Sequence, residues 1–412
     1  MIVIGAGAAG LAAAAALVRA GRSVQIVEAR NRVGGRCDTR RVPGLPVPIE
    51  LGAEFIHGRP EATFELLRKA GVAAVDSTRT QRFLKRGKLE PIDAFAEAQK
   101  AMRDRAALNK KDVSFTEFLE QTPGLSSLTR RFALMMVQGF DAADPTRISA
   151  RDLAEEWGSG AIGSSQLRPL GGYGPLLESL TGRGARLRLQ TIVREVRWKR
   201  GSVEIEGRFL GKPWRTKAKR AVITLPLGVL QSDLVRFFPS LREKQAALKK
   251  LAPGPVIRVA MRFRSAFWEE ACPGVAFFHS PAAAFPTFWT PLPMRVPLLT
   301  AWAGGPKAAR LTGRPAAQLV RLALATVEQV FQKSVAGRLI AAYVQDWRDD
   351  PYARGGYSYV TVGGQGAREL LAASLQDTLY FAGEATNCEG EAGTVGGALQ
   401  SGARAARELM ES

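Results

Sequence analysis

Hydrophobic and polar positions alternate along the first 28 residues in a way that predicts a β-α-β unit. The short apolar run Met1–Ile4 is typical of a buried parallel strand. An Ala- and Leu-rich stretch to about Ala20 predicts a helix, and Val24–Val27 predicts a second strand that ends at Glu28. Because a helix that joins two strands in this way builds a parallel sheet, we expect an α/β domain at the start of the chain.

The pattern changes further along the chain. Residues 79–160 are expected to be helical and polar, and residues 185–225 alternate like antiparallel strands that end at residues 221–225. Residues 272–315 show no clear period, and no internal repeat or low-complexity linker is visible. Strands are expected at residues 256–263 and 379–381, and helices at Ala94–Leu108, Thr116–Glu120, Leu128–Phe140, Ala150–Trp157, residues 241–251, Gln318–Phe331 and Gly397–Met410.

Glycines punctuate the junction between the first strand and the first helix, in Gly5-Ala-Gly7-Ala-Ala-Gly10. Such glycines allow a tight turn and a close backbone approach, so that the pyrophosphate of a dinucleotide can sit on the helix N-terminus. Glu28 follows at the spacing of a carboxylate that accepts from the ribose hydroxyls of adenosine. Gly34, Gly35 and the donor fork of Arg36 come next, and they favour FAD over NAD.

Composition excludes several classes of protein. The 412 residues are 46% hydrophobic and 23% charged, which excludes a disordered, a collagen-like or a disulfide-scaffold chain. The three cysteines lie far apart and only two histidines are present, so we expect no disulfide framework and no metal site. No apolar run is long enough to span a membrane. We therefore expect a cytoplasmic protein, either a monomer or a homodimer.

The charge is unusual, because 58 Lys and Arg residues against 38 Asp and Glu residues give a formal net charge of +20. Residues 183–220 alone hold 13 Lys and Arg residues against three glutamates. An anionic partner, such as a nucleic acid, and a solvated surface without a partner are both open interpretations.

Several further segments, in order along the chain, resemble the flavin-containing amine oxidase family, which includes monoamine oxidases, polyamine and spermine oxidases and histone lysine demethylases. They are Leu51-Gly-Ala-Glu-Phe-Ile-His-Gly58, Thr224-Leu-Pro-Leu-Gly-Val-Leu230, Ala301-Trp-Ala-Gly-Gly305, residues 346–359, Phe381-Ala-Gly-Glu384 and residues 393–402. Residues 79–170 match weakly.

The resemblance implies an α/β fold in which a Rossmann-like FAD-binding domain is interleaved with an α+β substrate domain, as in p-hydroxybenzoate hydroxylase. The expected FAD-binding domain comprises residues 1–75, 173–255 and 346–412. The expected substrate domain comprises residues 76–172 and 256–345.

The resemblance also assigns roles to residues. Glu384 should bind the ribityl chain of FAD, Thr394 and Val395 should lie near the pyrimidine edge, Val193 should contact the adenine through its backbone, and Trp347 should pack on the isoalloxazine. The whole expected cofactor set is Gly5, Gly7, Ala9, Gly10, Glu28, Ala29, Arg30, Gly34, Gly35, Arg36, Gly52, Ala53, Glu54, Val193, Trp347, Gly383, Glu384, Gly393, Thr394 and Val395.

The sequence departs from the family at its active-site lysine, which holds a water near flavin N5 and assists the reduction of O₂. Counting back from the Phe267-Trp268 pair places Arg258 at that position. Arginine keeps the positive charge but cannot lose its proton. O₂ and another electron acceptor both remain open, as does the alternative that Arg258 is a surface residue at a strand end.

Two other departures concern the flavin and its aromatic neighbours. Gly356 stands where monoamine oxidases carry the cysteine that attaches the flavin, so the FAD should be non-covalent. Tyr357 matches the first ring of the family's aromatic pair, but Thr394 stands at the second. A further ring could come from Trp289 or Phe288, although both are also explained as core residues.

The expected reaction follows from the resemblance. A neutral primary or secondary amine, or an amino acid, gives a hydride from its α-carbon to flavin N5, and the imine hydrolyses; O₂, which gives hydrogen peroxide, or another acceptor then reoxidises the flavin. His57, Arg258 and Tyr357 are the expected catalytic residues, although His57 is also explained as a loop histidine, and His279 is expected to be structural. The positive field favours an uncharged or acid-bearing amine, whose carboxylate Arg258 could hold.

Two other functions stay open. One is a flavin-dependent desaturase or dehydrogenase that acts on a C–C bond of an apolar substrate. The other is a basic flavoprotein that mainly binds nucleic acid or another partner.

Overall fold

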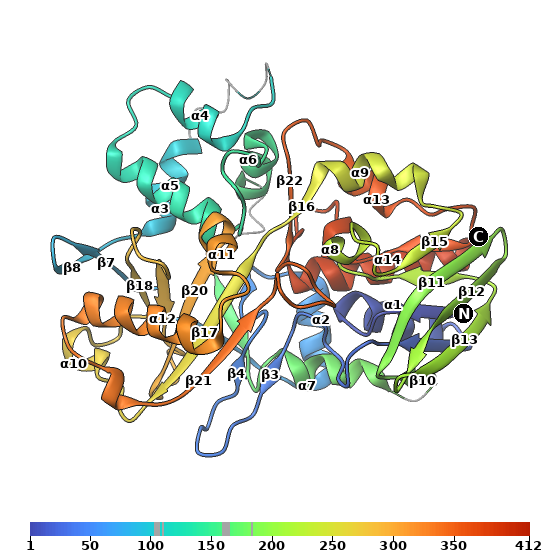
Figure 1. Ribbon diagram of the computed structural model, residues 1–412, viewed down its shortest axis with the longest axis horizontal. Helices are drawn as coiled ribbons and strands as arrows, with labels where there is room; N and C mark the ends of the chain where they lie inside the picture. The colour runs from blue at the N-terminus through green and yellow to red at the C-terminus, as the bar shows by residue number, and fades with distance from the viewer. Residues whose placement is uncertain (103–107, 109–110, 159–164, 183) are drawn as a thin grey trace.

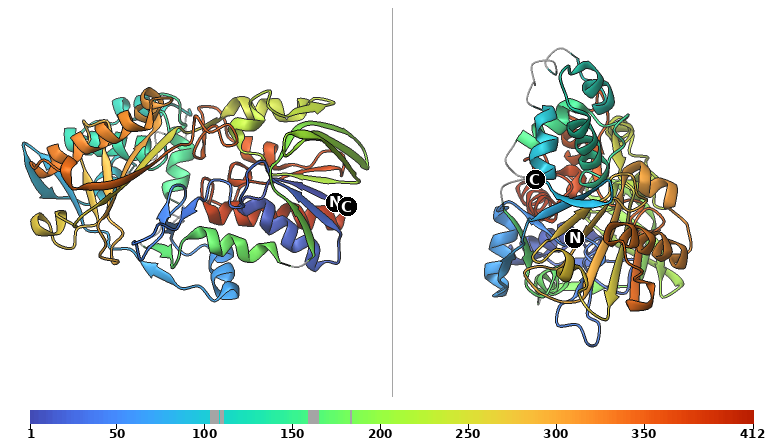
Figure 2. Two further views of the ribbon diagram at one scale, coloured as in Figure 1. Left: turned by 60° about the horizontal axis from the view of Figure 1, so that its bottom comes forward. Right: turned by 90° about the vertical axis from the view of Figure 1, so that its left-hand side faces the viewer.

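The computed structural model describes residues 1–102, 108, 111–158, 165–182 and 184–412, which form two lobes (Figure 1). One lobe contains both termini, which lie close together at its far end (Figure 2). Residues 103–107 of the predicted Ala94–Leu108 helix, and Arg183 at the start of the basic cluster, lie outside the described residues.

The terminal lobe is built on a parallel sheet whose strand order within the described residues is β10-β2-β1-β14-β23. All four pairings in this sheet are parallel, and the strands are short and buried, as the apolar runs predict. The strands are β1 (Ile2–Ile4), β2 (Val24–Val27), β10 (Ala185–Arg188), β14 (Ala221–Ile223) and β23 (Leu379–Phe381).

Two long helices pack closely beside this sheet, α1 (Ala8–Arg19) and α14 (Val395–Glu411). A Cβ at Gly402 would lie 2.1 Å from the carbonyl oxygen of Ala9, so only glycine permits this helix contact. A Cβ at Gly10 would lie 2.0 Å from the carbonyl oxygen of Gly5. Gly10 therefore lets α1 start directly over the end of β1.

A second sheet in the same lobe has the order β13-β12-β11-β15 within the described residues. Its inner face packs on the parallel sheet through Val196, Val203 and Ile205. The strands are β11 (Thr191–Lys199), β12 (Ser202–Phe209), β13 (Lys212–Ala218) and β15 (Arg236–Phe238).

The other lobe contains a larger sheet, with the order β21-β17-β20-β19-β18-β7-β8 within the described residues. All its pairings are antiparallel except that of β18 with β7. The strands are β7 (Gln81–Lys85), β8 (Lys88–Pro91), β17 (Val256–Phe263), β18 (Phe277–His279), β19 (Thr287–Trp289), β20 (Leu298–Gly304) and β21 (Leu339–Asp346).

Helices pack against this sheet, and a group of helices lies above it in Figure 1. One face packs on α10 (Trp268–Ala271), α11 (Gly305–Leu311) and α12 (Ala316–Phe331). A separate helical group has its own core around Phe115, Phe132 and Leu153. It consists of α3 (Ala94–Gln99), α4 (Phe115–Gln121), α5 (Ser127–Gly139) and α6 (Ala150–Gly158).

Short elements connect the lobes and complete the fold. The short strands are β3 (Thr39–Arg40), β4 (Ile49–Glu50), β5 (Ile56–His57), β6 (Ala74–Asp76), β9 (Gln166–Pro169), β16 (Leu251–Pro253) and β22 (Ser358–Val360). The remaining α-helices of the described residues are α2 (Glu61–Ala70), α7 (Tyr173–Glu178), α8 (Leu227–Leu230), α9 (Gln245–Lys250) and α13 (Ala367–Ala372). The 3₁₀ turns there are Lys100–Met102, Ser179–Thr181, Arg242–Lys244, Ala336–Arg338 and Glu384–Thr386.

The hydrophobic pattern predicted most of these elements, but it was wrong in three places. The β7–β8 hairpin lies in a region expected to be helical, and β18, β19 and β20 lie in the region without a clear period. β10 and β14 join the parallel sheet, although this part of the chain was expected to be antiparallel. The proposed domain boundaries stay a prediction.

Candidate active site

A cavity of about 1040 Å³ is lined by residues of both lobes. It begins at the carboxyl ends of β1 and β2, the edge where open parallel sheets bind their ligands. From there it continues past Tyr357 and reaches α3, α5 and α6. One continuous space thus joins the glycine turn to the helical group.

The glycine turn forms the first wall of the cavity. Gly5 has a φ of 109°, a conformation that glycine tolerates and that turns the chain from β1 into α1. The helix begins after Gly7 with no side-chain cap, so its first N–H groups are free of a protein side chain. Gly34 donates to the carbonyl oxygen of Ala6 at 2.8 Å and holds the second glycine pair against this turn. The arrangement is that of an anion site at a helix N-terminus.

Glu28 closes this end of the cavity with a buried carboxylate. Its two oxygens accept from the backbone N–H groups of Ala6 and Arg30, at 2.8 and 2.9 Å. These bonds fix the carboxylate at the end of β2, and each oxygen keeps a lone pair for a further donor.

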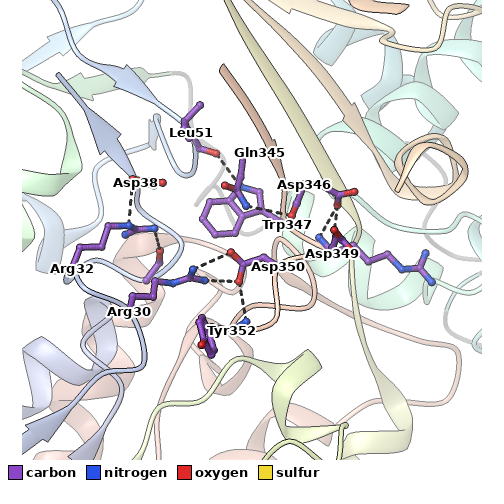
Figure 3. A network of polar contacts seen from close by, with 12 residues as sticks. Arg30, Arg32, Asp38, Leu51, Gln345, Asp346, Trp347, Asp349, Asp350 and Tyr352 are labelled. Atoms are coloured by element: carbon purple, nitrogen blue, oxygen red, sulfur yellow. Dashed lines mark hydrogen bonds and ion pairs between the residues drawn. The ribbon is translucent and has the colours of Figure 1, made fainter. Parts of the chain in front are cut away.

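Arg30 belongs to a network of polar contacts at the same end (Figure 3). Its guanidinium forms two hydrogen bonds with the carboxylate of Asp350, at 2.9 and 2.6 Å. It also lies over the rings of Tyr352 and Trp347, at 5.4 and 6.0 Å from their centroids. Trp347 donates from its indole to the carbonyl oxygen of Leu51 at 2.9 Å. The network joins the segment after β2 to the segment after β21.

Arg36 and Glu384 form a second pair across the cavity, at 2.8 Å. Arg36 also donates to the carbonyl oxygen of Gly356, and Ser358 donates to Glu384 from both its backbone and its hydroxyl. Burial alone would raise the pKa of Glu384, but Arg36, together with Arg368 and Ser358, outweighs it and lowers that pKa. Glu384 is therefore a fixed carboxylate in the middle of the cavity.

The N-terminus of α14 meets the cavity beside Tyr357. Thr394 is the N-cap, and its hydroxyl accepts from the backbone N–H of Gly397 at 2.9 Å. A Cβ built on Gly393 would lie 3.5 Å from the ring of Tyr357, so the tyrosine packs on the turn that starts the helix.

Arg258 lines the cavity and is only 2% exposed. It donates to the carbonyl oxygen of Gly52 at 2.9 Å, pairs with Glu54 and lies 5.1 Å from the ring centroid of Trp289. Arg168 also pairs with Glu54, at 2.7 Å, and the indole of Trp289 donates to the same carboxylate. Arg258 is therefore a buried residue, and its alternative interpretation as a surface residue was wrong.

Glu54 is the common partner of both arginines. Its burial would raise its pKa, but Arg258 and Arg168 outweigh this effect and lower the pKa to about 2. Both terminal nitrogens of Arg258 are already engaged by Gly52 and Glu54. Its Nε is buried without a partner, and the expectation that Arg258 could hold a substrate carboxylate stays a prediction.

Aromatic side chains form the wall beyond Tyr357. The Tyr357 hydroxyl donates to the carbonyl oxygen of Phe140, and the indole of Trp302 donates to that of Gly139 at 2.8 Å. The rings of Trp302 and Trp289 lie 5.6 Å apart. Other rings that line this wall are Phe55, Phe95, Phe140 and Phe277.

His57 faces the same wall, where its ring meets that of Phe140 edge-on at 5.0 Å. Burial lowers the pKa of His57 to about 4, so the imidazole is neutral at pH 7. His279 also lines the cavity, with its Nε2 2.9 Å from the amide oxygen of Gln81. Its structural role stays a prediction, although the residue also borders the cavity.

Two carboxyl groups line the cavity at the helical group, Asp141 just after α5 and Glu156 on α6. The indole of Trp157 lies 3.4 Å from one oxygen of Asp141, while the other oxygen is buried without a hydrogen-bond partner. Burial is the main cause that raises the pKa of both groups, for Glu156 to about 7. The lining of the cavity thus includes two acidic groups from the helical group.

Residues 8–410 match the family model described as flavin containing amine oxidoreductase. The chain belongs to this family.

Curated relatives of this amine oxidoreductase include human lysine-specific histone demethylase 2, which is 27% identical over 99% of the chain and 53% of the relative. Polyamine oxidase 4 of Oryza sativa subsp. japonica is 27% identical over 100% of the chain and 88% of the relative. The chain spans about a third to a half of the length of three demethylases that it matches.

Solved structures share the fold of this amine oxidoreductase along its whole length. Putrescine oxidase bound to putrescine superimposes with a TM-score of 0.83 at 21% identity, covering 100% of this chain and 98% of that one. Cyclohexylamine oxidase from Brevibacterium oxydans superimposes with a TM-score of 0.82 at 22% identity and the same coverage. The chain is therefore an α/β oxidoreductase with a two-domain FAD fold, and its cofactor is FAD, bound non-covalently.

The structure brings the predicted site residues of this amine oxidoreductase to one cavity, with the exception of Gly10, which packs against Gly5. The uncapped start of α1, the glycine turn and the fixed Glu28 carboxylate fit a dinucleotide. Of the two candidate rings, Trp289 lines the cavity, whereas Phe288 is buried in the core.

Sequence reasoning missed Trp302, Asp141 and Glu156. Trp302 lies in one of the segments that resemble the family, so its place in that segment could have marked it as a candidate site residue. No sequence rule joins Asp141 to Glu156, because one follows α5 and the other lies within α6.

The sequence also predicts that the chain has no metal site and no membrane-spanning segment, and both expectations are compared here with the described residues. There, no group of three or more His, Cys, Asp or Glu side chains is arranged to hold a metal ion. No helix found there is long and apolar enough to cross a bilayer. On the basic sheet, Glu195 pairs with Arg197 and Arg236, and Glu204 with Arg215 and Lys217. An anionic partner for this sheet stays a prediction.

Proposed function

We propose that this oxidoreductase oxidises a primary or secondary amine at the carbon that bears the nitrogen. Bound FAD supplies the acceptor for a hydride at its N5 atom. The substrate loses this hydride from carbon and a proton from nitrogen, and water hydrolyses the resulting imine to a carbonyl compound and ammonia or a smaller amine. The proposal agrees with the names of the relatives, which are polyamine, putrescine and cyclohexylamine oxidases.

We assign the cofactor to the part of the cavity between the glycine turn and α14. The free N–H groups at the start of α1 and those of Gly34 and Gly35 would bind the pyrophosphate. Glu28 would accept from the ribose and Glu384 from the ribityl chain, while Trp347 would pack on the ring system. Val193, at the irregular register of β11, would contact the adenine through its backbone.

The observation that carries the proposal is the wall of rings beyond Tyr357. Tyr357 and Trp302 both line the cavity, and hydrogen bonds to the end of α5 fix the positions of both rings. The faces of such rings attract an amine in its cationic form and pack against its carbon atoms in its neutral form. Asp141 and Glu156 at the same end disfavour a substrate carboxylate. We therefore favour an amine without a carboxylate over an amino acid.

Arg258 bears on the question of which electron acceptor reoxidises the flavin. Arg258 occupies the position of the family lysine, and Gly52 and Glu54 hold its guanidinium in place. Unlike a lysine, an arginine stays protonated at physiological pH and cannot act as a base toward a water molecule. We propose that O₂ reoxidises the flavin slowly and that another electron acceptor serves instead.

The test is anaerobic reduction of the FAD-loaded protein by a panel of amines and amino acids, followed through the flavin absorbance. We expect at least one amine without a carboxylate to bleach the flavin, and slow recovery of the colour when air is admitted. If dithionite bleaches the flavin and every amine fails, amine oxidation is wrong and a C–C dehydrogenase takes its place. Fast recovery in air would instead overturn the assignment of the acceptor.

A further inference from the structure

Two negatively charged features, the C-terminus of α5 and the carboxyl group of Asp141, lie together beside the aromatic side chains of the cavity. The helix ends at Gly139, and the carbonyl groups at a helix C-terminus carry a partial negative charge. Asp141 follows directly, at the end of the helix where a carboxylate is least favourable. Its side chain is 6% exposed, lines the cavity and leaves one oxygen, Oδ2, without a hydrogen-bond partner.

A buried carboxyl oxygen without a donor is costly, so its persistence points to a ligand that supplies the donor. The rings of Tyr357, Trp302 and Phe140 line the cavity around this group. The donors of Tyr357 and Trp302 are used by the carbonyl oxygens of α5, so neither serves Asp141. The missing donor must enter through the cavity.

Glu156 adds a second carboxyl group to this place, and it is half-buried on α6. The charged and titratable groups that act on the pair come from several elements. Asp152 and Glu156 lie on α6, Tyr357 precedes β22, Arg368 lies on α13, and Glu384 follows β23. Arg368 is the cation among them: it donates to Ser358, and its charge lowers the pKa of Glu156 against the effect of burial.

We propose that Asp141 and Glu156 bind the ammonium group of the substrate and accept its proton. An N–H bond of the ammonium breaks and an O–H bond forms on the carboxyl pair, so that the amine becomes neutral and its nitrogen lone pair is free. No oxidant is needed for this step. The inference rests on the amine oxidation proposed above and names the group that prepares the substrate for it.

His57 does not compete for this role, because its pKa of about 4 would leave it a weak base. The carboxyl pair has raised pKa values, which bring it closer to the pKa of an amine than an ordinary carboxylate. The pair must hold at least one negative charge to accept a proton. Amine binding should therefore strengthen as the pH rises through about 7 and then level off.

The probe is 2-phenylpropan-2-amine, whose nitrogen-bearing carbon has no hydrogen and which therefore cannot be oxidised. The matched neutral probe is 2-phenylpropan-2-ol. Calorimetry on the FAD-loaded protein gives a Kd for each compound. We expect Asp141→Asn and Glu156→Gln each to raise the Kd of the amine at least about tenfold at pH 8 and to change that of the alcohol less than about threefold. The pH dependence of amine binding should disappear in the double variant.

Glu155→Gln is the control, because Glu155 is an exposed neighbour on the same helix. Flavin absorbance and thermal melting show whether each variant has kept its fold. If Asp141→Asn fails to fold, Glu156→Gln decides the question alone, because Glu156 is only half-buried. Parallel losses for amine and alcohol, unchanged amine binding, or no amine binding by the natural sequence would each overturn the inference.

The panel of reducing amines separates this inference from the proposed function. If amines reduce the flavin of the variants as fast as that of the natural sequence, amine oxidation stands and the role of the carboxyl pair is wrong. If no amine reduces the flavin but 2-phenylpropan-2-amine binding depends on Asp141 and Glu156, the ammonium site stands and amine oxidation is wrong.

Discussion

Arg258 and Glu54 form a buried ion pair although 203 residues of the chain separate them. The pair holds the segment after β4 against the middle of β17, and both residues line the cavity. Arg168 joins the same carboxylate from β9, so one acidic group fixes two arginines. The positive charge of Arg258 is thus held in place by the protein.

The first prediction concerns the reaction of the reduced flavin with O₂. We expect Arg258→Lys to increase the rate constant of reoxidation at least about tenfold, because a lysine ammonium rotates freely and can hold a water molecule. Stopped-flow mixing of dithionite-reduced protein with air-saturated buffer measures this rate without any substrate. Arg262→Lys, on the same strand, is the control. An unchanged rate for Arg258→Lys would show that the guanidinium does not limit the reaction of the reduced flavin with O₂.

The second prediction concerns the stability of the Glu54 cluster. Glu54→Gln leaves the buried charges of Arg258 and Arg168 without their common anion. Breaking a buried pair in this way costs about 3–5 kcal/mol in the free energy of unfolding. Urea unfolding measures this loss. Glu90→Gln removes an exposed pair with Lys85 and should cost less than about 1 kcal/mol. Similar losses in the two variants would show that burial does not distinguish the pairs.

The local parts of the site could be predicted from the sequence, because each depends on residues that are close along the chain. Gly5, Gly7 and Glu28 follow from one β-α-β unit, and their positions agree with the motif. The β7–β8 hairpin also had a local signal, since Arg86-Gly87 forms its turn with φ values of 47° and 79°. The polar character of the surrounding residues concealed that signal.

The remaining parts of the site depend on tertiary contacts that no spacing encodes. Arg258 could be placed on its strand by counting, but its partner Glu54 could not be identified. Asp141 follows an ordinary helix and becomes an active-site candidate only because Tyr357 and Glu156 meet it in space. The net charge of +20 could not show that two acidic groups, Asp141 and Glu156, line the cavity, and the class of substrate stays a prediction.

The third prediction concerns the pH dependence of stability at Glu50. This buried carboxyl accepts from the backbone N–H of Tyr173 and the hydroxyl of Thr39, and burial raises its pKa to about 7. Between pH 4.5 and 7 the folded state keeps a proton that the unfolded state has lost, so stability falls as the pH rises through this window. The full effect is about 3 kcal/mol.

Glu50→Gln removes this dependence, because an amide does not ionise. We expect the variant to gain stability relative to the natural sequence between pH 5 and pH 8, as measured by urea unfolding at both values. Glu178→Gln changes an exposed carboxylate and should show no such gain. A difference between Glu50→Gln and the natural sequence that does not change with pH would contradict the raised pKa.

The last prediction separates the ring of Tyr357 from its hydroxyl. Tyr357→Phe keeps the ring beside Gly393 and removes the donor to the carbonyl oxygen of Phe140, whereas Tyr357→Ala removes both. A ring face near a cation contributes about 0.5–2 kcal/mol, so we expect Tyr357→Ala to raise the Kd of 2-phenylpropan-2-amine by about 3- to 30-fold more than that of the alcohol. Tyr357→Phe should change the ratio of the two constants by less than about threefold.

Tyr343→Ala, on β21 and outside the cavity lining, is the control. Equal ratios for the alanine and phenylalanine variants would show that the ring does not contact the ammonium group, and the carboxyl pair would then have to hold it alone.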